Sequence, residues 1–190
     1  MSTVDQTRAD STTRDIAYVA VFAAFIVALA LFPAISIGVV PITLQTFAVA
    51  LTAMVLGARR GTYAVLAYLA LIAIGLPVAA GYTGGLGVLT GPTGGFLAAF
   101  VVQALITGRL ATWATRTTGG IARFVLAGVA GLPLVYVLGT SWLMVVTGLP
   151  LGQALAAAVT PFVVIDTIKV VLAAIVAAGV LRALPTLARR

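Results

Sequence analysis

The chain contains no cysteine, no histidine and no glutamate among its 190 residues. Without cysteine, it can form neither a disulfide framework nor a thiolate metal site. Without histidine and glutamate, it has few groups left for zinc binding or for general acid–base catalysis. We therefore expect a protein that is not an enzyme and that holds no metal and no cofactor of its own.

Charged residues are also scarce: they make up 8% of the chain, whereas hydrophobic residues make up 62%. A soluble domain of this size carries roughly a quarter charged residues to solvate its surface. This composition indicates that lipid surrounds the protein. The net charge of +7 does not indicate nucleic-acid binding. The basic residues stand singly or in pairs at the ends of apolar runs, whereas phosphate-binding residues cluster on one solvated face.

Long apolar runs separated by short polar or proline-containing breaks occupy most of the chain. The first run has about 20 residues, which at ~1.5 Å per residue crosses a ~30 Å hydrocarbon core. We predict an all-α membrane protein, a single six-helix substrate-binding domain over residues 16–184. Residues 1–15 are interpreted as a loose polar cytoplasmic tail, and residues 185–190 as a basic cytoplasmic tail. The six helices are expected over residues 16–35, 42–56, 62–76, 95–113, 121–146 and 154–181.

The arginines test this topology independently. With six crossings and both termini in the cytoplasm, every arginine falls on the cytoplasmic side, as the positive-inside rule requires. The other three connections, near residues 33–41, 77–94 and 147–153, contain no lysine or arginine. Five or seven crossings would break this separation, so we predict a multi-pass protein of the cell membrane with both termini inside. The arginines are Arg8, Arg14, Arg59, Arg60, Arg109, Arg116, Arg123, Arg182, Arg189 and Arg190.

A glycine-rich segment joins the third and fourth predicted helices. Residues 75–95, GLPVAAGYTGGLGVLTGPTGG, contain eight glycines and two prolines. Glycine allows the backbone to bend sharply and to expose its N–H and C=O groups. Non-helical backbone at membrane depth is tolerated only where protein buries it or where it lines a wet cavity. We therefore expect a ligand-binding loop here on the outer face, with Gly81, Tyr82, Thr83, Gly84 and Gly85 as candidate contacts.

Two charged residues lie inside an apolar run. Beyond residue 15, Asp166 is the sole acid, and Lys169 is the sole lysine of the chain. Their spacing places them on one face of the sixth helix, in its outer half. A charge near the bilayer centre costs ~2.5–3.5 kcal/mol, so such residues usually face the bundle interior and serve a function. A purely structural ion pair is the alternative.

Other polar or small residues give weaker signals. Gln45, at the start of the second predicted helix, either points into the same cavity or forms an interhelical hydrogen bond. Tyr82 either stacks on a ligand or anchors at the lipid interface. Tyr136, Trp113 and Trp142 are interpreted as packing or interface residues. In the first helix, small residues at four-residue spacing allow close helix approach, either within the bundle or to a partner protein. They are Ala17, Ala20, Ala24 and Ala28.

Together these segments resemble the BioY family, the biotin-specific substrate-binding (S) components of energy-coupling factor (ECF) transporters. The matching pieces are VPITLQT, the segment GLPVAAGYTGGLGVLTGPTGGF, VYVLGTSWL and PFVVIDTIK, in the family's order. The resemblance implies capture of biotin at the outer face. It also implies a shared transmembrane coupling protein and two ATPase subunits that use ATP, and this chain has no P-loop motif of its own. Ala20 and Ala24 resemble the family's docking face for the coupling protein.

The resemblance also suggests how biotin is held. Asp166 and Lys169 lie only ~5–6 Å apart, so they serve one end of the ligand. Our hypothesis is that Asp166 accepts a ureido N–H while Lys169 donates to the ureido C=O or keeps Asp166 ionised. The carboxylate would bind loop amides and the helix start near Gly94 and Gly95. The inverted pose, with Lys169 on the carboxylate, is the main alternative. Ala80, Gly81 and Tyr82 stand where some relatives place a polar side chain.

Two other functions compete with this interpretation. The first is a stand-alone ion- or proton-coupled carrier or channel for a small solute. A filter needs a symmetric ring of carbonyls and carriers usually contain inverted repeats, and neither is visible in the sequence. The second is an intramembrane enzyme, which needs a nucleophile with a base or a metal site. An isolated Asp–Lys pair offers little for such chemistry.

Overall fold

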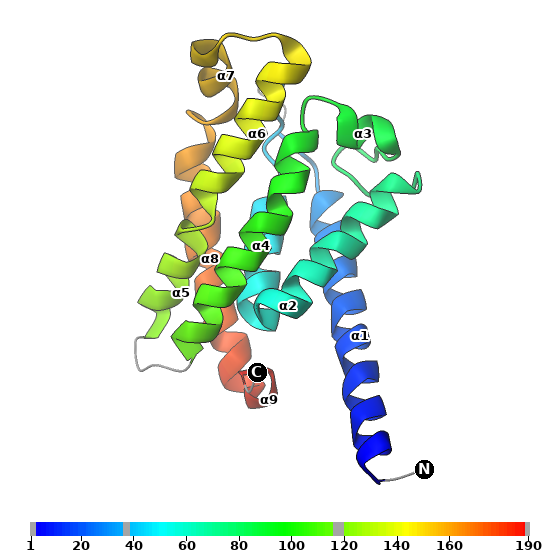
Figure 1. Cartoon of the computed structure of the whole chain (residues 1–190). Coiled ribbons are helices and arrows are strands. Elements are labelled where there is room, and N and C mark those ends of the chain that lie inside the picture. Colours follow the sequence, from blue (N-terminus) through cyan, green and yellow to red (C-terminus); the bar gives the residue numbers. More distant parts are fainter. Residues whose placement is uncertain (1–2, 36–38, 116–119, 189–190) are drawn as a thin grey trace.

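The computed structural model describes residues 3–35, 39–115 and 120–188, with side chains from Thr12 to Leu187 within those ranges. Helices dominate it (Figure 1). Apart from two isolated bridges, Ile35 with Ile42 and Ala79 with Thr83, the described ranges contain no β-structure. The helices are α1 (Thr3–Ala30), α2 (Gln45–Ala73), α3 (Leu86–Thr90), α4 (Gly94–Thr115), α5 (Gly120–Val129), α6 (Leu132–Thr147), α7 (Leu151–Ala158), α8 (Phe162–Ala183) and α9 (Pro185–Ala188).

Five helical stretches of the described chain are long and apolar enough to cross a membrane. This confirms the prediction of an all-α protein of membrane type. The sequence predicted six crossings, and the difference lies in α2, where the helices expected over residues 42–56 and 62–76 form one continuous element. The stretches are Thr12–Ala30, Gln45–Ala73, Gly94–Thr115, Gly120–Thr147 and Leu151–Ala183.

The helix α2 folds back on itself at Gly57. This residue has φ 77° and ψ −178°, a backbone conformation that is open to glycine and strained for other residues. Beyond the turn the two arms pack together, so that a Cβ at Gly61 would lie 3.0 Å from the Cα of Ala53. A side-chain hydrogen bond between Gln45 and Tyr68 joins the far ends of the arms. The α2 element is therefore a helical hairpin built without a separate loop.

The helix α4 packs along this hairpin. A Cβ at Gly108 would lie 2.4 Å from the backbone nitrogen of Ala58, so glycine is needed where α4 crosses the Gly57 turn. The side chains of Ala48, Ala64 and Ala104 are fully buried in the same hydrophobic cluster. Small residues thus bring the helix backbones close together, as is usual where no aqueous hydrophobic effect drives association between helices.

Two of the predicted helices are interrupted. The stretch from Gly120 to Thr147 breaks into α5 and α6 next to Pro133, which lies in the first turn of α6. The stretch from Leu151 to Ala183 breaks into α7 and α8 at Pro161, which caps α8. Proline has no N–H to donate to the preceding turn, so both breaks have a local cause.

Two expectations about irregular segments need correction. The helix α1 begins at Thr3, so residues 3–15, which we expected to form a loose tail, are helical. Asp15 forms an ion pair with Arg60 of α2, which ties this part of α1 to the rest of the protein. The glycine-rich segment 75–95 is not irregular throughout, since it contains the short helix α3 and the first residues of α4.

The two chain ends lie toward the same end of the bundle, and α3 and α7 lie toward the other (Figure 1). The segments that carry described arginines, namely the first part of α1, the Gly57 turn, the end of α4, the start of α5 and the end of α8, lie in the half that contains the termini. Arg116, Arg189, Arg190 and the side chain of Arg8 lie outside the described residues. Which side of the membrane each end faces, and the number of crossings, stay predictions.

The Gly108 contact yields a stability test. We expect Gly108→Ala to lower the free energy of unfolding by about 1–3 kcal/mol, because the added methyl group meets backbone atoms that cannot rotate away. The matched control is Gly179→Ala in α8, where the new Cβ would meet nothing within 4 Å. The control should be neutral or slightly stabilising, since alanine favours helix over glycine. Thermal unfolding in detergent measures both, and equal melting temperatures would contradict the close packing.

Candidate ligand-binding cavity

A cavity lies among α2, α4, α6 and α8, beneath the glycine-rich segment. The volume of the cavity is about 110 Å³. A single water needs a cavity volume of only ~10–15 Å³, so this cavity can hold a small organic molecule. Its wall is mainly apolar, with a few polar side chains, the usual composition of a small-molecule site. The lining residues are Val40, Pro41, Thr43, Gln45, Thr46, Ala79, Ala80, Thr83, Val88, Thr93, Phe96, Leu97, Phe100, Val135, Tyr136, Ala158, Phe162, Asp166 and Lys169.

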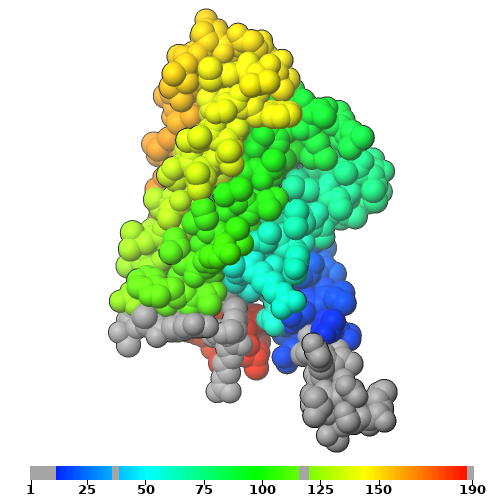
Figure 2. Space-filling view, in the orientation of Figure 1, coloured from blue at the N-terminus to red at the C-terminus, as the bar shows by residue number. Residues whose placement is uncertain are grey.

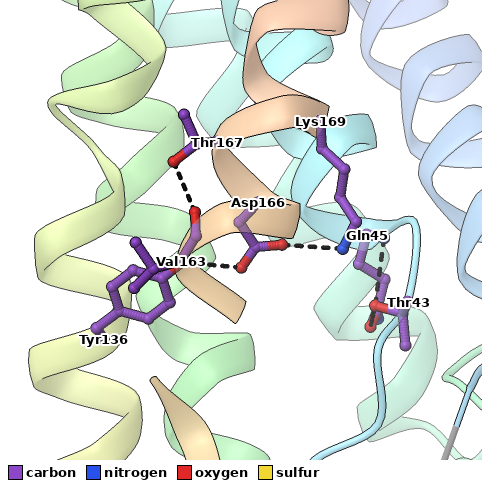
Figure 3. A network of polar contacts seen from close by, with 7 residues as sticks. All are labelled: Thr43, Gln45, Tyr136, Val163, Asp166, Thr167 and Lys169. Atoms are coloured by element: carbon purple, nitrogen blue, oxygen red, sulfur yellow. Dashed lines mark hydrogen bonds and ion pairs between the residues drawn. The ribbon is translucent and has the colours of Figure 1, made fainter. Parts of the chain in front are cut away.

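Asp166 and Lys169 face this cavity, as the sequence predicted. The Lys169 ammonium donates to Asp166 Oδ1 at 2.9 Å, and the Tyr136 hydroxyl donates to Asp166 Oδ2 at 3.1 Å. Figure 3 shows the carboxylate lying between the ammonium from its own helix and the phenol from α6. Asp166 is 4% exposed and Lys169 is 8% exposed. The two charges neutralise each other, and each carboxylate oxygen keeps a lone pair for another donor.

The pattern of α8 explains why both charges point inward. The helix starts at Phe162, directly after Pro161, and its buried residues recur at three- and four-residue intervals. Asp166 and Lys169 occupy two positions of this buried stripe. Toward the C-terminus the same stripe continues with small residues that pack against α2 and α5. The apolar periodicity of the helix therefore places the ion pair inside the bundle.

Gln45 satisfies both interpretations that the sequence left open. It lines the cavity, and its amide nitrogen also donates to the hydroxyl of Tyr68 at 2.6 Å across the α2 hairpin. Its amide oxygen accepts a hydrogen bond from Thr43 at 2.9 Å, also drawn in Figure 3. Tyr68 is completely buried. The Gln45 side chain is thus held in place before any ligand arrives.

The glycine-rich segment contributes only part of what we expected. Of its five candidate residues, Thr83 lines the cavity. Gly81, Tyr82, Gly84 and Gly85 lie in the same segment but not on the cavity wall. Their observed role is conformational: Gly81 and Gly85 have φ of 72° and 89°, and a Cβ at Gly84 would lie 2.1 Å from the carbonyl oxygen of Leu76.

Tyr82 is the clearest departure within this segment. It is 69% exposed and adopts φ 58°, the sole positive φ of a non-glycine residue within the described ranges. Such a conformation is uncommon for a residue with a Cβ. The neighbouring Thr83 accounts for the turn, because its backbone carbonyl accepts from Ala79 N–H and its hydroxyl donates to the carbonyl of Ala80.

The start of α4 differs from the anion site that we expected. The N–H of Gly94 already donates to the carbonyl oxygen of Gly91 at 3.0 Å. A Cβ at Gly95 would lie 2.2 Å from Cβ of Trp142, so this glycine serves close packing between α4 and α6. The residue that this turn presents to the cavity is Thr93.

Tyr136, which we interpreted as a packing or interface residue, does pack against both hydrophobic clusters, and it also reaches the cavity, which sequence reasoning missed. Its hydroxyl binds Asp166, and its ring lies on the cavity wall. The sequence carries no periodic signal that pairs a residue of α6 with one of α8, since they are thirty positions apart. The only available hint was a phenol in an apolar helix, where a buried hydroxyl usually needs a partner. Trp142 does serve packing, and its indole N–H donates to Gly91.

The alanine stripe of α1 faces outward. Ala17, Ala20, Ala24 and Ala28 are exposed, whereas Ala23, Ile26 and Ala30 on the other face are buried against the bundle. The sequence left open whether these alanines pack internally or meet another protein. Within this structure they do not pack internally, and α1 presents a smooth surface that another helix can approach closely.

The arrangement can hold a small, largely apolar molecule with a polar end. Phe96, Phe100 and Phe162 provide apolar wall, and the Asp166–Lys169–Tyr136 network provides acceptors and donors. Within the described residues, no group of three or more His, Cys, Asp or Glu side chains could hold a metal ion. The chemistry of the site is therefore recognition by hydrogen bonds inside an apolar enclosure.

The chain is similar to known proteins over almost its whole length. It is 40% identical to "Biotin transporter BioY" of Rhizobium etli over 185 residues, covering 94% of this chain and 98% of that one. It is 42% identical to "Biotin transporter BioY" of Rhodobacter capsulatus over 173 residues, covering 86% and 91%. It is 44% identical to "Biotin transporter BioY2" of Lactococcus lactis over 153 residues, covering 80% and 81%.

A solved structure shows the same fold. The crystal structure of the S-component for biotin from an ECF-type ABC transporter superposes with a TM-score of 0.85 and 28% sequence identity, covering 96% of this chain and 95% of that one. The sequence profile of the BioY family matches residues 3–186. Together with the three relatives, this match confirms the resemblance seen in the sequence, and the chain belongs to the BioY family.

Proposed function

We propose that this chain is the high-affinity biotin-binding S component of an ECF-type vitamin importer and that it captures biotin at the outer face of the membrane. The observation that carries the proposal is the buried Asp166–Lys169 pair on the wall of an apolar cavity. The chain also belongs to a family whose named relatives are biotin transporters, and this membership supports the assignment. The protein itself performs no chemical step on the vitamin.

In the proposed complex, one end of biotin meets the ion pair. Asp166 accepts a ureido N–H, while the Lys169 ammonium at 2.9 Å keeps the carboxylate ionised. Gln45 and Thr83 add hydrogen-bonding groups on the cavity wall, and the three phenylalanines contact the apolar part of the ligand. The carboxylate of biotin points toward the glycine-rich segment and the Thr93 hydroxyl, nearer to solvent. Gly81, Tyr82, Gly84 and Gly85 shape this entrance.

Transport requires partners, because this chain has no nucleotide-binding motif. We propose that it assembles with a transmembrane coupling protein and two ATPase subunits of an ECF module, which use ATP. The exposed stripe with Ala20 and Ala24 is the surface that we assign to the coupling protein, because its small side chains let another helix approach α1 closely. The chain spans the cell membrane several times, with the arginine-bearing end and both termini in the cytoplasm.

Direct binding tests the proposed function. Calorimetry of the detergent-purified chain should give saturable heat with biotin and none with thiamine or riboflavin, because the cavity presents one ion pair suited to a ureido group. Dethiobiotin should bind as well, since it keeps the ureido ring and differs at the apolar thioether. Binding of thiamine without biotin would remove the assignment while leaving the fold unchanged.

The orientation of biotin follows from the response of Lys169→Ala to two ligands. If Lys169 serves to keep Asp166 ionised, the substitution should weaken biotin and its carboxyl-blocked amide in parallel, by tenfold or more, because a buried carboxylate is left without a counterion. Thr167→Ala, at a half-buried neighbour on α8 that does not line the cavity, is the control and should bind both ligands normally. A Lys169→Ala variant that loses biotin but keeps the amide would establish the inverted pose.

Tyr136 provides a second test of the site. We expect Tyr136→Phe to weaken biotin binding about five- to tenfold, because the ~1–1.5 kcal/mol of one hydrogen bond that orients Asp166 is lost. Tyr63→Phe, at a half-exposed tyrosine that does not line the cavity, should leave the affinity unchanged.

A double-mutant cycle separates positioning from simple packing. In an Asp166→Asn background the additional effect of Tyr136→Phe should shrink, since the two side chains act through one hydrogen bond. An undiminished additional effect would show that the phenol acts independently of the carboxylate.

A further inference from the structure

A second hollow lies between α1 and α2, apart from the ligand cavity. The volume of this hollow is about 570 Å³. Its lining residues are Thr12, Asp15, Ile16, Val19, Arg59, Arg60 and Tyr63. In the space-filling view, the blue part of α1 lies at the edge of the molecule beside α2, drawn in cyan (Figure 2). None of these residues lines the ligand cavity.

The hollow exists because α1 packs on the bundle only along its later part. From Ala23 onward α1 buries one side chain about every turn, at Ala23, Ile26 and Ala30. Before that point no described side chain of α1 is fully buried, and Ile16 is 64% exposed. The two helices therefore leave a wedge whose α1 wall is apolar at Ile16 and Val19 and whose α2 wall carries Arg59 and Arg60.

The wedge contains more positive charge than negative. Asp15 pairs with Arg60, which also lies 5.7 Å from the ring centre of Tyr18. Arg59 is exposed, and no carboxylate of the described residues lies within ion-pairing distance of it. Among the described residues the Arg59 guanidinium therefore has no carboxylate partner and can bind an anion, and Arg60 can share that anion.

The depth of the wedge in the membrane indicates which kind of anion it can bind. The apolar run of α1 begins at Ile16, directly after the charged residues Arg14 and Asp15, so this level is where the helix passes from water into hydrocarbon. A phosphate at this depth belongs to a lipid, and its acyl chain would lie against Ile16 and Val19. Basic pockets between membrane helices are suited to anionic headgroups. We propose that the wedge between α1 and α2 binds the phosphate headgroup of an anionic phospholipid, with Arg59 as the main contact.

This site is independent of biotin and of the proposed function. It places one lipid beside α1, the helix whose other exposed face carries Ala20 and Ala24. A lipid there fills the gap that α1 leaves and adds a tie between α1 and α2 in addition to the Asp15–Arg60 ion pair.

Native mass spectrometry of the detergent-purified full chain tests the proposal, using equal amounts of phosphatidylglycerol and phosphatidylcholine of distinguishable mass. The wild type should retain phosphatidylglycerol preferentially. Arg59→Gln should lower this preference about fivefold, the effect of one basic residue near an anionic lipid. Arg109→Gln is the matched control, because Arg109 is an exposed arginine in the same half of the bundle that does not line the wedge, and it should leave the preference unchanged.

A third variant should change the lipid preference in the opposite direction. Asp15→Asn removes the carboxylate that neutralises Arg60, so it should raise the preference for phosphatidylglycerol. The Asp15–Arg60 pair is partly exposed, and such a pair contributes little to stability, so this variant should remain folded.

Three results would overturn the proposal. The first is equal retention of the two lipids by the wild type. The second is an equal loss in Arg59→Gln and Arg109→Gln, which would indicate diffuse attraction rather than a site. The third is displacement of phosphatidylglycerol by millimolar inorganic phosphate, which would indicate a site for a soluble anion.

Discussion

The structure depends on keeping one carboxylate and one ammonium out of lipid. Asp166 and Lys169 each carry a cost of ~2.5–3.5 kcal/mol near the bilayer centre if left unpaired. The protein offsets this cost by placing both on the buried stripe of α8, 2.9 Å apart, with the Tyr136 hydroxyl on the remaining carboxylate oxygen. The surrounding helices then enclose a cavity that is polar around this pair and apolar along much of its remaining wall. The need to bury the Asp166–Lys169 pair therefore also creates the site that can recognise a ligand.

Glycine determines how closely the helices around this space can approach. Gly57 lets α2 reverse without a loop, and Gly108 lets α4 cross that turn against backbone atoms. On the opposite side, a Cβ at Gly139 would lie 2.2 Å from the ring of Phe96, so this glycine lets the ring pack against α6. Phe96 is part of the cavity wall. The shape of the site thus follows from missing side chains as much as from those present.

Much of this architecture could be predicted from local patterns. Apolar runs of sufficient length indicated membrane helices, although two of the expected helices break, at Pro133 and Pro161. The isolated acid and lysine in one apolar run indicated an interior polar site. The irregular segments were harder: residues 3–15 are helical, and segment 75–95 contains α3. In both cases polar or glycine-rich composition predicted loops, whereas the backbone is helical over residues 3–15 and over Leu86–Thr90.

By itself, the sequence determined that lipid surrounds the protein, that the fold is all-α, and which charged pair belongs to the site. These properties follow from hydropathy and charge, which can be read within a single helix. Only the tertiary structure decided which distant side chains meet that pair. Tyr136 reaches Asp166 and Tyr68 reaches Gln45 across separations of 30 and 23 residues, and no local period links them. It also decided that Thr83, rather than Gly81 or Tyr82, faces the cavity. Such pairings depend on how helix backbones cross, and close packing at a few glycines determines those crossings.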